Sequence, residues 1–385
     1  MNTTRKGYVI MNFKDLGISE PLVQVLKKSG IISPTPIQKE CIPLIKDFKD
    51  VIAQAQTGTG KTLAFLLPLF ENISPEKDAT QALIITPTRE LALQITEEAK
   101  KLATAKSMNV LAAYGGRNIG SQLNKLKGTI HLVIATPGRL IDHIERGTIH
   151  LNQIKTVVID EADQMLLMGF RNEVDQILKV TPRNRQTLCF SATMTSNVKK
   201  LAYRYTYSPI TVSIEPKKVT IDTIRQEVIE TTDRWKADTL CQVLEEDNPF
   251  LAIIFARTKR RADELFAKMK KRGFNVQVIH SDIAQNKRER ILKSFREADL
   301  QYLIATDVAS RGLDINGITH IYNYDVPETP EIYIHRIGRT GRAGDDGYTC
   351  MFVAPKDHLE FNMIERKLRR NLPKRQLKEE LRKTK

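Results

Sequence analysis

The sequence has few cysteines, few aromatic residues and no long hydrophobic run. Its cysteines number only four and stand far apart in the chain: Cys41, Cys189, Cys241 and Cys350. This spacing excludes a local C-x-x-C metal clip and favours reduced thiols in the core. The longest strongly apolar run, Leu63–Phe70, is far shorter than the roughly 20 residues that span a bilayer. Near the N-terminus no apolar stretch is long enough for a secretory signal, so we expect a cytoplasmic protein without a membrane span.

Acidic residues are outnumbered, with 45 Asp and Glu against 60 Lys and Arg and a formal net charge of +15. The basic excess falls on residues 1–215 and 361–385, whereas residues 216–360 are balanced. Such an excess favours a polyanionic partner, but it does not separate nucleic acid binding from simple solubility. The 385 residues, 41% of them apolar, predict two or three globular domains and exclude a wholly disordered chain.

Short apolar runs rich in β-branched residues recur, separated by stretches of helical character. The first series is Ala82–Thr86, Val110–Tyr114, Leu132–Ala135, Thr156–Asp160 and Thr187–Phe190. The second series is Glu227–Thr231, Ala252–Ala256, Asn275–Ile279, Leu303–Thr306, His320–Tyr324 and Tyr348–Val353. Runs that are apolar on both faces and joined by crossover-length segments predict buried parallel strands. We therefore expect an α/β fold with two similar sheets, each mostly parallel and flanked by helices.

The best candidate for a linker follows the first series, where apolar residues are few and Pro216 stands. The expected parts are an N-terminal domain, a linker, a C-terminal domain and a basic tail, over residues 1–214, 215–223, 224–355 and 356–385. In the tail, Arg366–Lys385 mixes basic residues with leucines on both sides of Pro373. This pattern predicts short amphipathic helices around a break, with a solvated terminal helix as the plainer alternative.

The most specific local signal is the run AQTGTGKT, which lies between the apolar Val51–Ala53 and the helix-prone Leu63–Phe70. A strand, a glycine-containing loop and a helix in that order aim backbone N–H groups at an anion. Lys61 would reach the β and γ phosphates of a nucleotide, and Thr62 would offer a hydroxyl to Mg²⁺. A glycine-rich turn without nucleotide is the alternative. The other residues of the loop are Ala55, Gln56, Thr57, Gly58, Thr59 and Gly60. Ala55 stands where the strict pattern has glycine.

An acidic cluster, Asp160–Asp163, follows the predicted strand Thr156–Ile159. Because the ends of parallel strands open onto the ligand crevice, Asp160 would hold Mg²⁺ through water and Glu161 would orient or deprotonate the attacking water. Alone, such a cluster is more often a helix N-terminus, where carboxylates meet the helix dipole. The phosphate loop upstream favours the metal site.

With these motifs the chain resembles the DEAD-box RNA helicases of superfamily 2, from about residue 13 to residue 344, and its short flanks resemble the smaller bacterial members. The resemblance implies two RecA-like domains, ATP with Mg²⁺, and RNA as partner, either single-stranded or as a short duplex. Gly30–Gln38, with Phe13 upstream, is similar to the Q motif. The family pattern then implies that the Gln38 amide reads the adenine edge and that Phe13 stacks on the base.

Further family motifs are present in the first half. The resemblance implies that several of their residues grip the RNA backbone, a contact that positions RNA without reading its sequence: Pro87, Thr88, Arg89, Gly116, Thr136, Gly138 and Arg139. It also implies that Ser191 and Thr193, from the Ser-Ala-Thr motif, bond Asp163 and so link the ATP site to RNA.

The second half carries the remaining motifs. The resemblance implies that Phe255, Arg288 and Thr306 contact RNA. It also implies that Asp314 contacts the nucleotide ribose. His335 would reach towards the Asp160 cluster, while Arg339 and Arg342 would act as arginine fingers. A guanidinium that reaches the γ-phosphate from another domain is worth about 10³ to 10⁵ in rate.

These motifs predict an ATP-dependent RNA helicase in which ATP and RNA favour the same closed state of the two domains and so promote each other's binding. Two alternatives stay open: an ATP-gated RNA clamp or scaffold that seldom unwinds, and a DNA translocase. Ribosomal or other ribonucleoprotein complexes are possible partners by resemblance. The sequence does not name the RNA.

Overall fold

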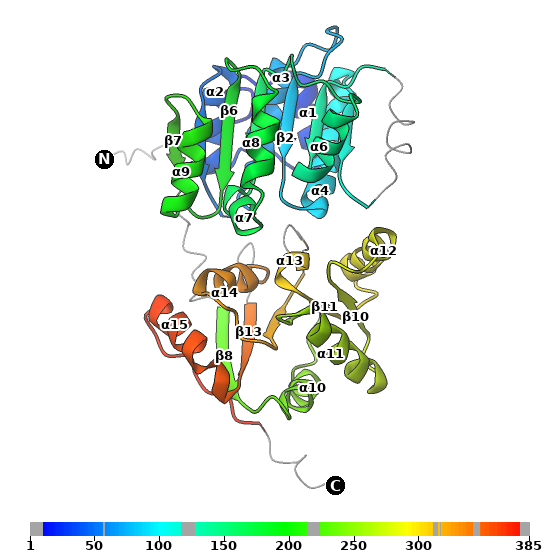
Figure 1. Ribbon diagram of the computed structural model, residues 1–385, viewed down its shortest axis with the longest axis vertical. Helices are drawn as coiled ribbons and strands as arrows, with labels where there is room; N and C mark the ends of the chain where they lie inside the picture. The colour runs from blue at the N-terminus through cyan, green and yellow to red at the C-terminus, as the bar shows by residue number, and fades with distance from the viewer. Residues whose placement is uncertain are drawn as a thin grey trace, which may run out of the picture. The chain divides into compact units, whose positions relative to one another are not determined.

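The computed structural model describes residues 11–56, 58–116, 128–214, 224–310, 315, 317–341 and 347–377. The chain divides into two compact units, Met1–Pro216 and Lys217–Lys385, each with a sheet covered by helices (Figure 1). Within this described part, no helix combines the length and apolarity needed to cross a bilayer.

The sheet of the first unit has seven strands in the order β3-β4-β2-β5-β6-β1-β7, and all its pairings are parallel. The strands are β1 (Val51–Gln54), β2 (Ala82–Ile85), β3 (Val110–Ala113), β4 (Leu132–Ala135), β5 (Thr156–Ile159), β6 (Gln186–Ser191) and β7 (Ile210–Ser213). The central strands are buried along their whole length. This burial explains why their sequences are mostly apolar.

Two layers of helices cover the two faces of this sheet. The helices are α1 (Glu20–Lys28), α2 (Pro36–Lys46), α3 (Lys61–Asn72), α4 (Arg89–Lys106), α6 (Pro137–Glu145), α7 (Ala162–Leu167), α8 (Arg171–Lys179) and α9 (Ser196–Tyr205). The first four pack in one hydrophobic cluster and the last four in another. Successive strand residues alternate between the clusters, as Leu83 and Ile84 do.

The second unit repeats this plan with six parallel strands in the order β10-β11-β9-β12-β13-β8. Its elements are β8 (Ile224–Glu230), α10 (Lys236–Asp247), β9 (Ala252–Phe255), α11 (Lys259–Lys271), β10 (Val276–Ile279), α12 (Gln285–Arg296), β11 (Tyr302–Ala305), α13 (Asp307–Ser310), β12 (His320–Asn323), α14 (Pro330–Ile337), β13 (Gly347–Val353), the 3₁₀ helix η2 (Pro355–Asp357) and α15 (His358–Leu368). Helices α10 and α11 pack on one face, whereas α12, α14 and α15 contribute to the clusters on the other.

The predicted fold class is confirmed, and every predicted strand coincides with an observed one. Strand β7 was not predicted because it lies at the sheet edge, where only Val212 of its four residues is buried. The predicted core thiols are confirmed as well, since all four cysteines are free and buried. Burial raises the pKa of Cys189 to about 12, which keeps this thiol protonated.

The tail differs from its prediction. Helix α15 ends at Leu368, and instead of a second helix the chain runs beside β8, with a parallel bridge between Val228 and Lys374. Val228 N donates to Pro373 O at 2.9 Å. The side chain of Leu372 is 5% exposed and packs in the core. Over residues 369–377 the prediction of amphipathic helices was wrong, because Leu372 packs in the core with β8 residues, a contact that helical periodicity does not reveal. Residues 378–385 of the predicted tail lie outside the described residues.

Candidate active site

The predicted phosphate loop connects β1 to α3, whose first residue is Lys61. Gly58 has φ 84° and Gly60 has φ 90°, values that glycine adopts without steric cost. Inside the loop, Thr59 Oγ1 donates to Gln56 O at 2.7 Å. The loop thus leads into a helix N-terminus, the arrangement that binds phosphates. Thr57 lies outside the described residues.

Gln38 braces this loop from α2. Its Nε2 donates to Gly60 O at 3.0 Å, and its Oε1 accepts from Thr35 N at 2.9 Å. The side chain is 2% exposed. Both ends of the amide therefore engage the protein itself, and the adenine contact of Gln38 stays a prediction.

Phe13 is not displayed as an open stacking surface. Its ring is 2% exposed and belongs to the hydrophobic core of the first unit. The same hydrophobic cluster contains the α1 and α2 residues Leu22 and Ile42. Its contact with a base stays a prediction.

Lys61 folds back over the loop that precedes it. Its side chain is 8% exposed, and Nζ donates to Ala55 O at 2.8 Å. Thr62 follows in the first turn of α3 and is half-buried. Lys61 and Thr62 therefore place an ammonium group and a hydroxyl group at the end of this loop, beside backbone N–H donors, which is the donor set that a polyphosphate with a cation requires.

Asp160 and Glu161 lie at the carboxyl end of β5. Asp160 is 3% exposed, and burial raises the pKa of its carboxyl group while the charge of Lys61 opposes that rise. Glu161 N donates to Asp160 Oδ1 at 2.9 Å. Glu161 has φ 50°, a left-handed conformation that costs energy for a side chain of this kind. The fold thus holds Glu161 in a backbone conformation that residues other than glycine rarely adopt.

Thr193 contacts Asp163 by two hydrogen bonds to Oδ2, from its backbone N at 3.1 Å and from Oγ1 at 3.0 Å. The predicted contact of Thr193 is therefore confirmed. Ser191 instead donates to Thr193 O at 2.7 Å, so its predicted bond to Asp163 was wrong. Because Ser191 ends β6 and Thr193 lies beyond it, only the second hydroxyl group reaches α7.

Sheet order brings these loops together. Strands β5, β6 and β1 are neighbours, and Gln54 is paired with Ser191 in the register of β1 and β6. Ala55 N donates to Ser191 O at 3.1 Å, which joins the phosphate loop to the Ser-Ala-Thr segment. The phosphate loop, the Asp160–Asp163 cluster and the Ser-Ala-Thr segment thus share the carboxyl edge of three adjacent strands.

The predicted RNA-contacting residues of this unit follow the next three strands, β3, β4 and β2. Thr88 Oγ1 accepts from Leu91 N at 3.3 Å and caps α4, whose first residue is the exposed Arg89. A Cβ on Gly115 would lie 2.9 Å from Arg89 Nη2, so the guanidinium group rests against a glycine. Pro87 is buried under this turn.

The α6 segment completes this group. Thr136 precedes α6 at its N-cap, Gly138 is exposed with no atom near its missing Cβ, and Arg139 lies 3.6 Å from Asp142. Gly116, after β3, is exposed and has φ 88°. Two helix N-termini, two arginines and two exposed glycines therefore lie along neighbouring strand ends, a surface suited to phosphate groups.

In the second unit, all three residues that are predicted to contact RNA are buried. Phe255 is 1% exposed and packs in the core, and its predicted RNA contact stays a prediction. Arg288 is 7% exposed and donates to Ala309 O, which ties α12 to α13. Thr306 is 8% exposed and accepts Ser310 N at 3.0 Å through its carbonyl oxygen. The phosphate contacts of Arg288 and Thr306 stay predictions.

The predicted arginine-finger segment follows β12. His335 lies in α14 and is half-buried, and Arg339 follows the helix, where its N donates to Arg336 O at 3.2 Å. Asp314 and Arg342 lie outside the described residues. The described part of this segment is therefore a helix end that presents a cation from a hydrogen-bonded turn.

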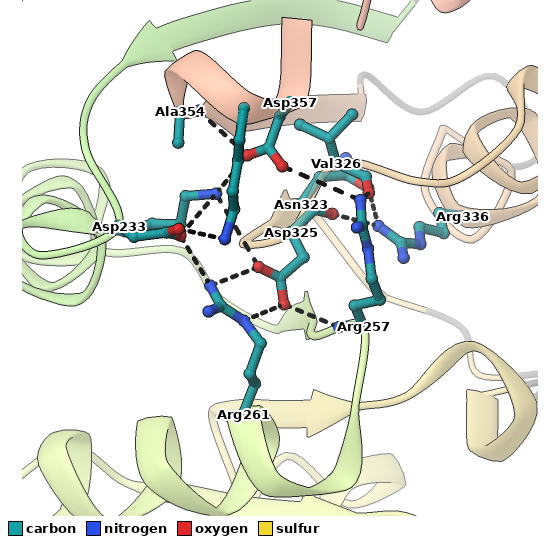
Figure 2. A network of polar contacts seen from close by, with 11 residues as sticks. Asp233, Arg257, Arg261, Asn323, Asp325, Val326, Arg336, Ala354 and Asp357 are labelled. Atoms are coloured by element: carbon teal, nitrogen blue, oxygen red, sulfur yellow. Dashed lines mark hydrogen bonds and ion pairs between the residues drawn. The ribbon is translucent and has the colours of Figure 1, made fainter. Parts of the chain in front are cut away.

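Sequence reasoning missed the role of Arg336, which is 2% exposed. Its Nε and Nη2 donate to the two carboxylate oxygens of Asp307 at 2.6 and 2.7 Å, and its guanidinium group lies 4.9 Å from the Phe255 ring centre. Nη1 donates to Asn323 Oδ1 at 3.0 Å and to Asp325 O at 2.8 Å (Figure 2). The one available signal was that Arg336 and Asp307 each stand within a quoted family motif.

Comparison with known proteins agrees with this site. Residues 35–201 match the DEAD/DEAH box helicase model, and residues 235–344 match the helicase conserved C-terminal domain. These matches define a helicase of two domains. The DEAD-box ATP-dependent RNA helicase CshA of Bacillus subtilis is 47% identical over 362 residues, covering 94% of this chain and 73% of the relative.

Solved structures match over nearly the whole chain. Saccharomyces cerevisiae Dbp5 bound to RNA and ADP BeF3 has a TM-score of 0.86 and 30% identity, covering 94% of this chain and 95% of that chain. Mss116p bound to single-stranded RNA and AMP-PNP has a TM-score of 0.85 and 30% identity, covering 96% and 80%. The chain therefore belongs to the DEAD-box ATP-dependent RNA helicases, a family of RNA-stimulated ATPases.

Proposed function

We propose that this chain couples the binding and hydrolysis of ATP to RNA binding and to local unwinding of short RNA duplexes. One observation carries the proposal: the nucleotide motifs follow β5, β6 and β1, the predicted RNA-contacting residues follow β3, β4 and β2, and the two sets share one edge of one sheet. A movement of the nucleotide loops can then displace the neighbouring residues that are predicted to contact RNA. The solved relatives that carry RNA together with a nucleotide support this assignment.

In this proposal Thr62 and Asp160 hold Mg²⁺, which when bound neutralises phosphate charge during transfer. The donor set fits, because Mg²⁺ prefers hydroxyl, carboxylate and water oxygens. The raised pKa of the Asp160 carboxyl group also fits, since a buried carboxylate without a bound cation is held at a cost. Lys61 binds the phosphates, and Glu161 orients or deprotonates the attacking water.

The second unit supplies the complementary groups. Arg339, with Arg342, is proposed to stabilise the charge that develops on the γ-phosphate, and His335 to reach towards the Asp160 cluster. Asp314 meets the ribose, while Arg288 and Thr306 contact RNA phosphates. If both ligands favour the same closed state of the domains 1–214 and 224–355, each must increase the affinity of the other.

Location and partners are proposed at a coarser level. Four free, buried cysteines fit a reducing compartment, and we propose a cytoplasmic protein. Ribosomal or other ribonucleoprotein complexes are proposed as partners on the family likeness alone.

A strand-displacement assay tests the proposed function. A short RNA duplex with a single-stranded extension is mixed with the full chain and ATP, and Glu161→Gln serves as the control that binds ATP without hydrolysing it. The helicase is supported if the wild-type chain releases strands only with ATP, and if Glu161→Gln does not sustain strand release over repeated cycles. ATP-dependent RNA retention without strand release would favour the ATP-gated clamp instead.

A further inference from the structure

A cluster of charges lies at the carboxyl edge of the second sheet, beside the proposed arginine-finger segment (Figure 2). Its members come from the loops and helix starts that follow four adjacent strands, β9, β12, β13 and β8. We name it the edge cluster, and it consists of Asp233, Lys236, Arg257, Arg261, Asp325 and Asp357.

The inner members of the edge cluster, Lys236, Asp325 and Asp357, are at most 7% exposed, whereas its outer members are partly exposed. Lys236 is 0% exposed, and its Nζ donates to Asp357 Oδ2 at 2.9 Å and lies 3.9 Å from Asp325 Oδ1. Three cations of the cluster face its three carboxylates, and the exposed Lys356 also pairs with Asp233. A buried ammonium group keeps its charge only when such partners compensate the loss of hydration, so removal of one charge changes the balance of the whole cluster.

Asp325 is the member that connects the cluster to the active-site segment. Its Oδ2 accepts from Arg257 N at 2.9 Å and from Arg261 Nε at 2.8 Å, and its Oδ1 lies 2.6 Å from Arg261 Nη2. The same residue uses its backbone carbonyl oxygen to accept from Arg336 Nη1 at 2.8 Å. The carboxylate thus fixes the backbone that holds Arg336.

Arg336 in turn connects two proposed sites. Its paired bonds to Asp307 hold the residue next to Thr306, the proposed RNA contact. Its own carbonyl oxygen accepts from Arg339 N, so the turn of the proposed arginine finger starts at Arg336. A two-point guanidinium–carboxylate contact fixes orientation as well as distance.

We propose that Asp325 is a positioning residue for ATP hydrolysis, acting through Arg336 on Arg339. The inference rests on the proposed function, because it takes Arg339 as the group that stabilises the transition state. Asp325 contacts no nucleotide in this scheme, and ATP is bound in the ground state mainly by the first unit. Loss of the Asp325 charge therefore lowers turnover and leaves ATP affinity in place.

The test measures RNA-stimulated ATP hydrolysis by the full chain with Asp325→Asn. We expect kcat to fall about tenfold while the KM for ATP changes less than about twofold. Arg375→Ala is the matched control, since it removes a cation of the same unit that pairs with Glu246 and Asp247, away from the motifs. It is expected to lower the melting temperature and to leave kcat unchanged at temperatures where both variants are folded.

A double-mutant cycle separates positioning from general damage. If Asp307→Asn and Asp325→Asn both act through Arg336, the double variant loses about as much kcat as the worse single variant, whereas independent effects multiply. Should Asp325→Asn fail to fold, Arg261→Lys weakens the same carboxylate contact while keeping the charge, and the same loss of kcat at constant KM is expected.

Three results would overturn the inference: an unchanged kcat in a folded variant, a loss of activity explained by KM, or multiplying losses in the double variant. Wild-type chain whose ATPase ignores RNA would contradict the proposed function itself, and that experiment is performed first.

Discussion

Gln38 Nε2 donates to the carbonyl oxygen of Gly60 at 3.0 Å, so the expected adenine-reading residue holds the expected phosphate loop. The other end of the amide accepts from Thr35 N, which opens α2. Helix α2 and the loop are thereby joined by one side chain. A substitution that shifts the backbone of Gly60 therefore disturbs the hydrogen bond from Gln38.

Gly60→Ala is predicted to weaken ATP binding strongly. A Cβ at this position would lie 2.5 Å from Gln38 Nε2 and 3.1 Å from Thr35 Oγ1, and the φ of 90° adds backbone strain. We expect a loss of ATP affinity of about tenfold or more, because the loop must move away from its phosphate-binding geometry. Equilibrium binding of a fluorescent ATP analogue measures it.

Gly58→Ala is the matched control. This glycine has a similar φ of 84°, but no atom lies within 4 Å of an added Cβ. The variant therefore carries only the backbone strain, and its affinity is expected to fall less than that of Gly60→Ala. Equal losses for both variants would contradict the role of the Gln38 contact.

Thr193→Ala is predicted to uncouple hydrolysis from strand release. It removes the Oγ1 bond to Asp163 and leaves the backbone bond in place. We expect ATP turnover to stay within about threefold, while duplexes opened per ATP fall about tenfold. Strand displacement and phosphate release are measured on the same sample. Thr195→Ala removes only the N-cap of α9 and is expected to retain coupling; equal uncoupling in both variants would count against the Asp163 contact.

Asp160→Asn is predicted to stabilise the nucleotide-free chain and to abolish hydrolysis. Burial raises the pKa of Asp160 above its ordinary value of 3.8, with Lys61 opposing the rise. An acid whose pKa is raised by folding destabilises the folded chain once pH exceeds that ordinary value, and the neutral amide avoids this cost. The variant should melt at a higher temperature than wild type at pH 7, and the difference should vanish as pH falls towards 3.8. A lower melting temperature at pH 7 would contradict the prediction.

Arg375→Ala is predicted to destabilise the second unit without changing RNA binding. Its guanidinium group is 16% exposed and contacts Glu246, Asp247 and the Tyr348 hydroxyl group. We expect a loss of about 2 kcal/mol in the free energy of unfolding, and thus a melting temperature lower by about 4–8 °C. The salt dependence of RNA affinity should not change, because this cation is already paired.

Lys374→Ala serves as the control for that change. Lys374 is the neighbouring cation, and its side chain is 66% exposed while it pairs with Glu230. Exposed pairs contribute about 0–1 kcal/mol, so its melting temperature should stay close to wild type. If Arg375→Ala instead reduced the salt dependence of RNA affinity, the tail would contribute to RNA binding.

Most of the fold could be predicted because central parallel strands are apolar on both faces, as Leu132–Ala135 and Thr156–Ile159 are. Strand β7 was not predicted because only one of its four residues is buried, so its sequence is not apolar on both faces. The family motifs placed the nucleotide loops correctly along the chain. They did not indicate which side chains the core covers, such as those of Phe13 and Phe255.

The edge cluster could not be predicted from sequence. Lys236 and Asp357 are 121 positions apart, and they meet only because β8 and β13 are neighbours in the sheet. Parallel sheets reorder their strands relative to the chain, so contacts at their edges depend on topology rather than on local pattern. Arg375 is a second example, since its partners lie on α10 and β13.

The most direct test of the central claim is the ATPase rate of the full chain with and without single-stranded RNA, alongside Glu161→Gln. We predict that RNA raises the wild-type rate severalfold, and that Glu161→Gln lowers it by about 10² or more with ATP still bound, as expected when a base in the transition state is removed. An equal rate with and without RNA, or full activity in Glu161→Gln, would contradict the account.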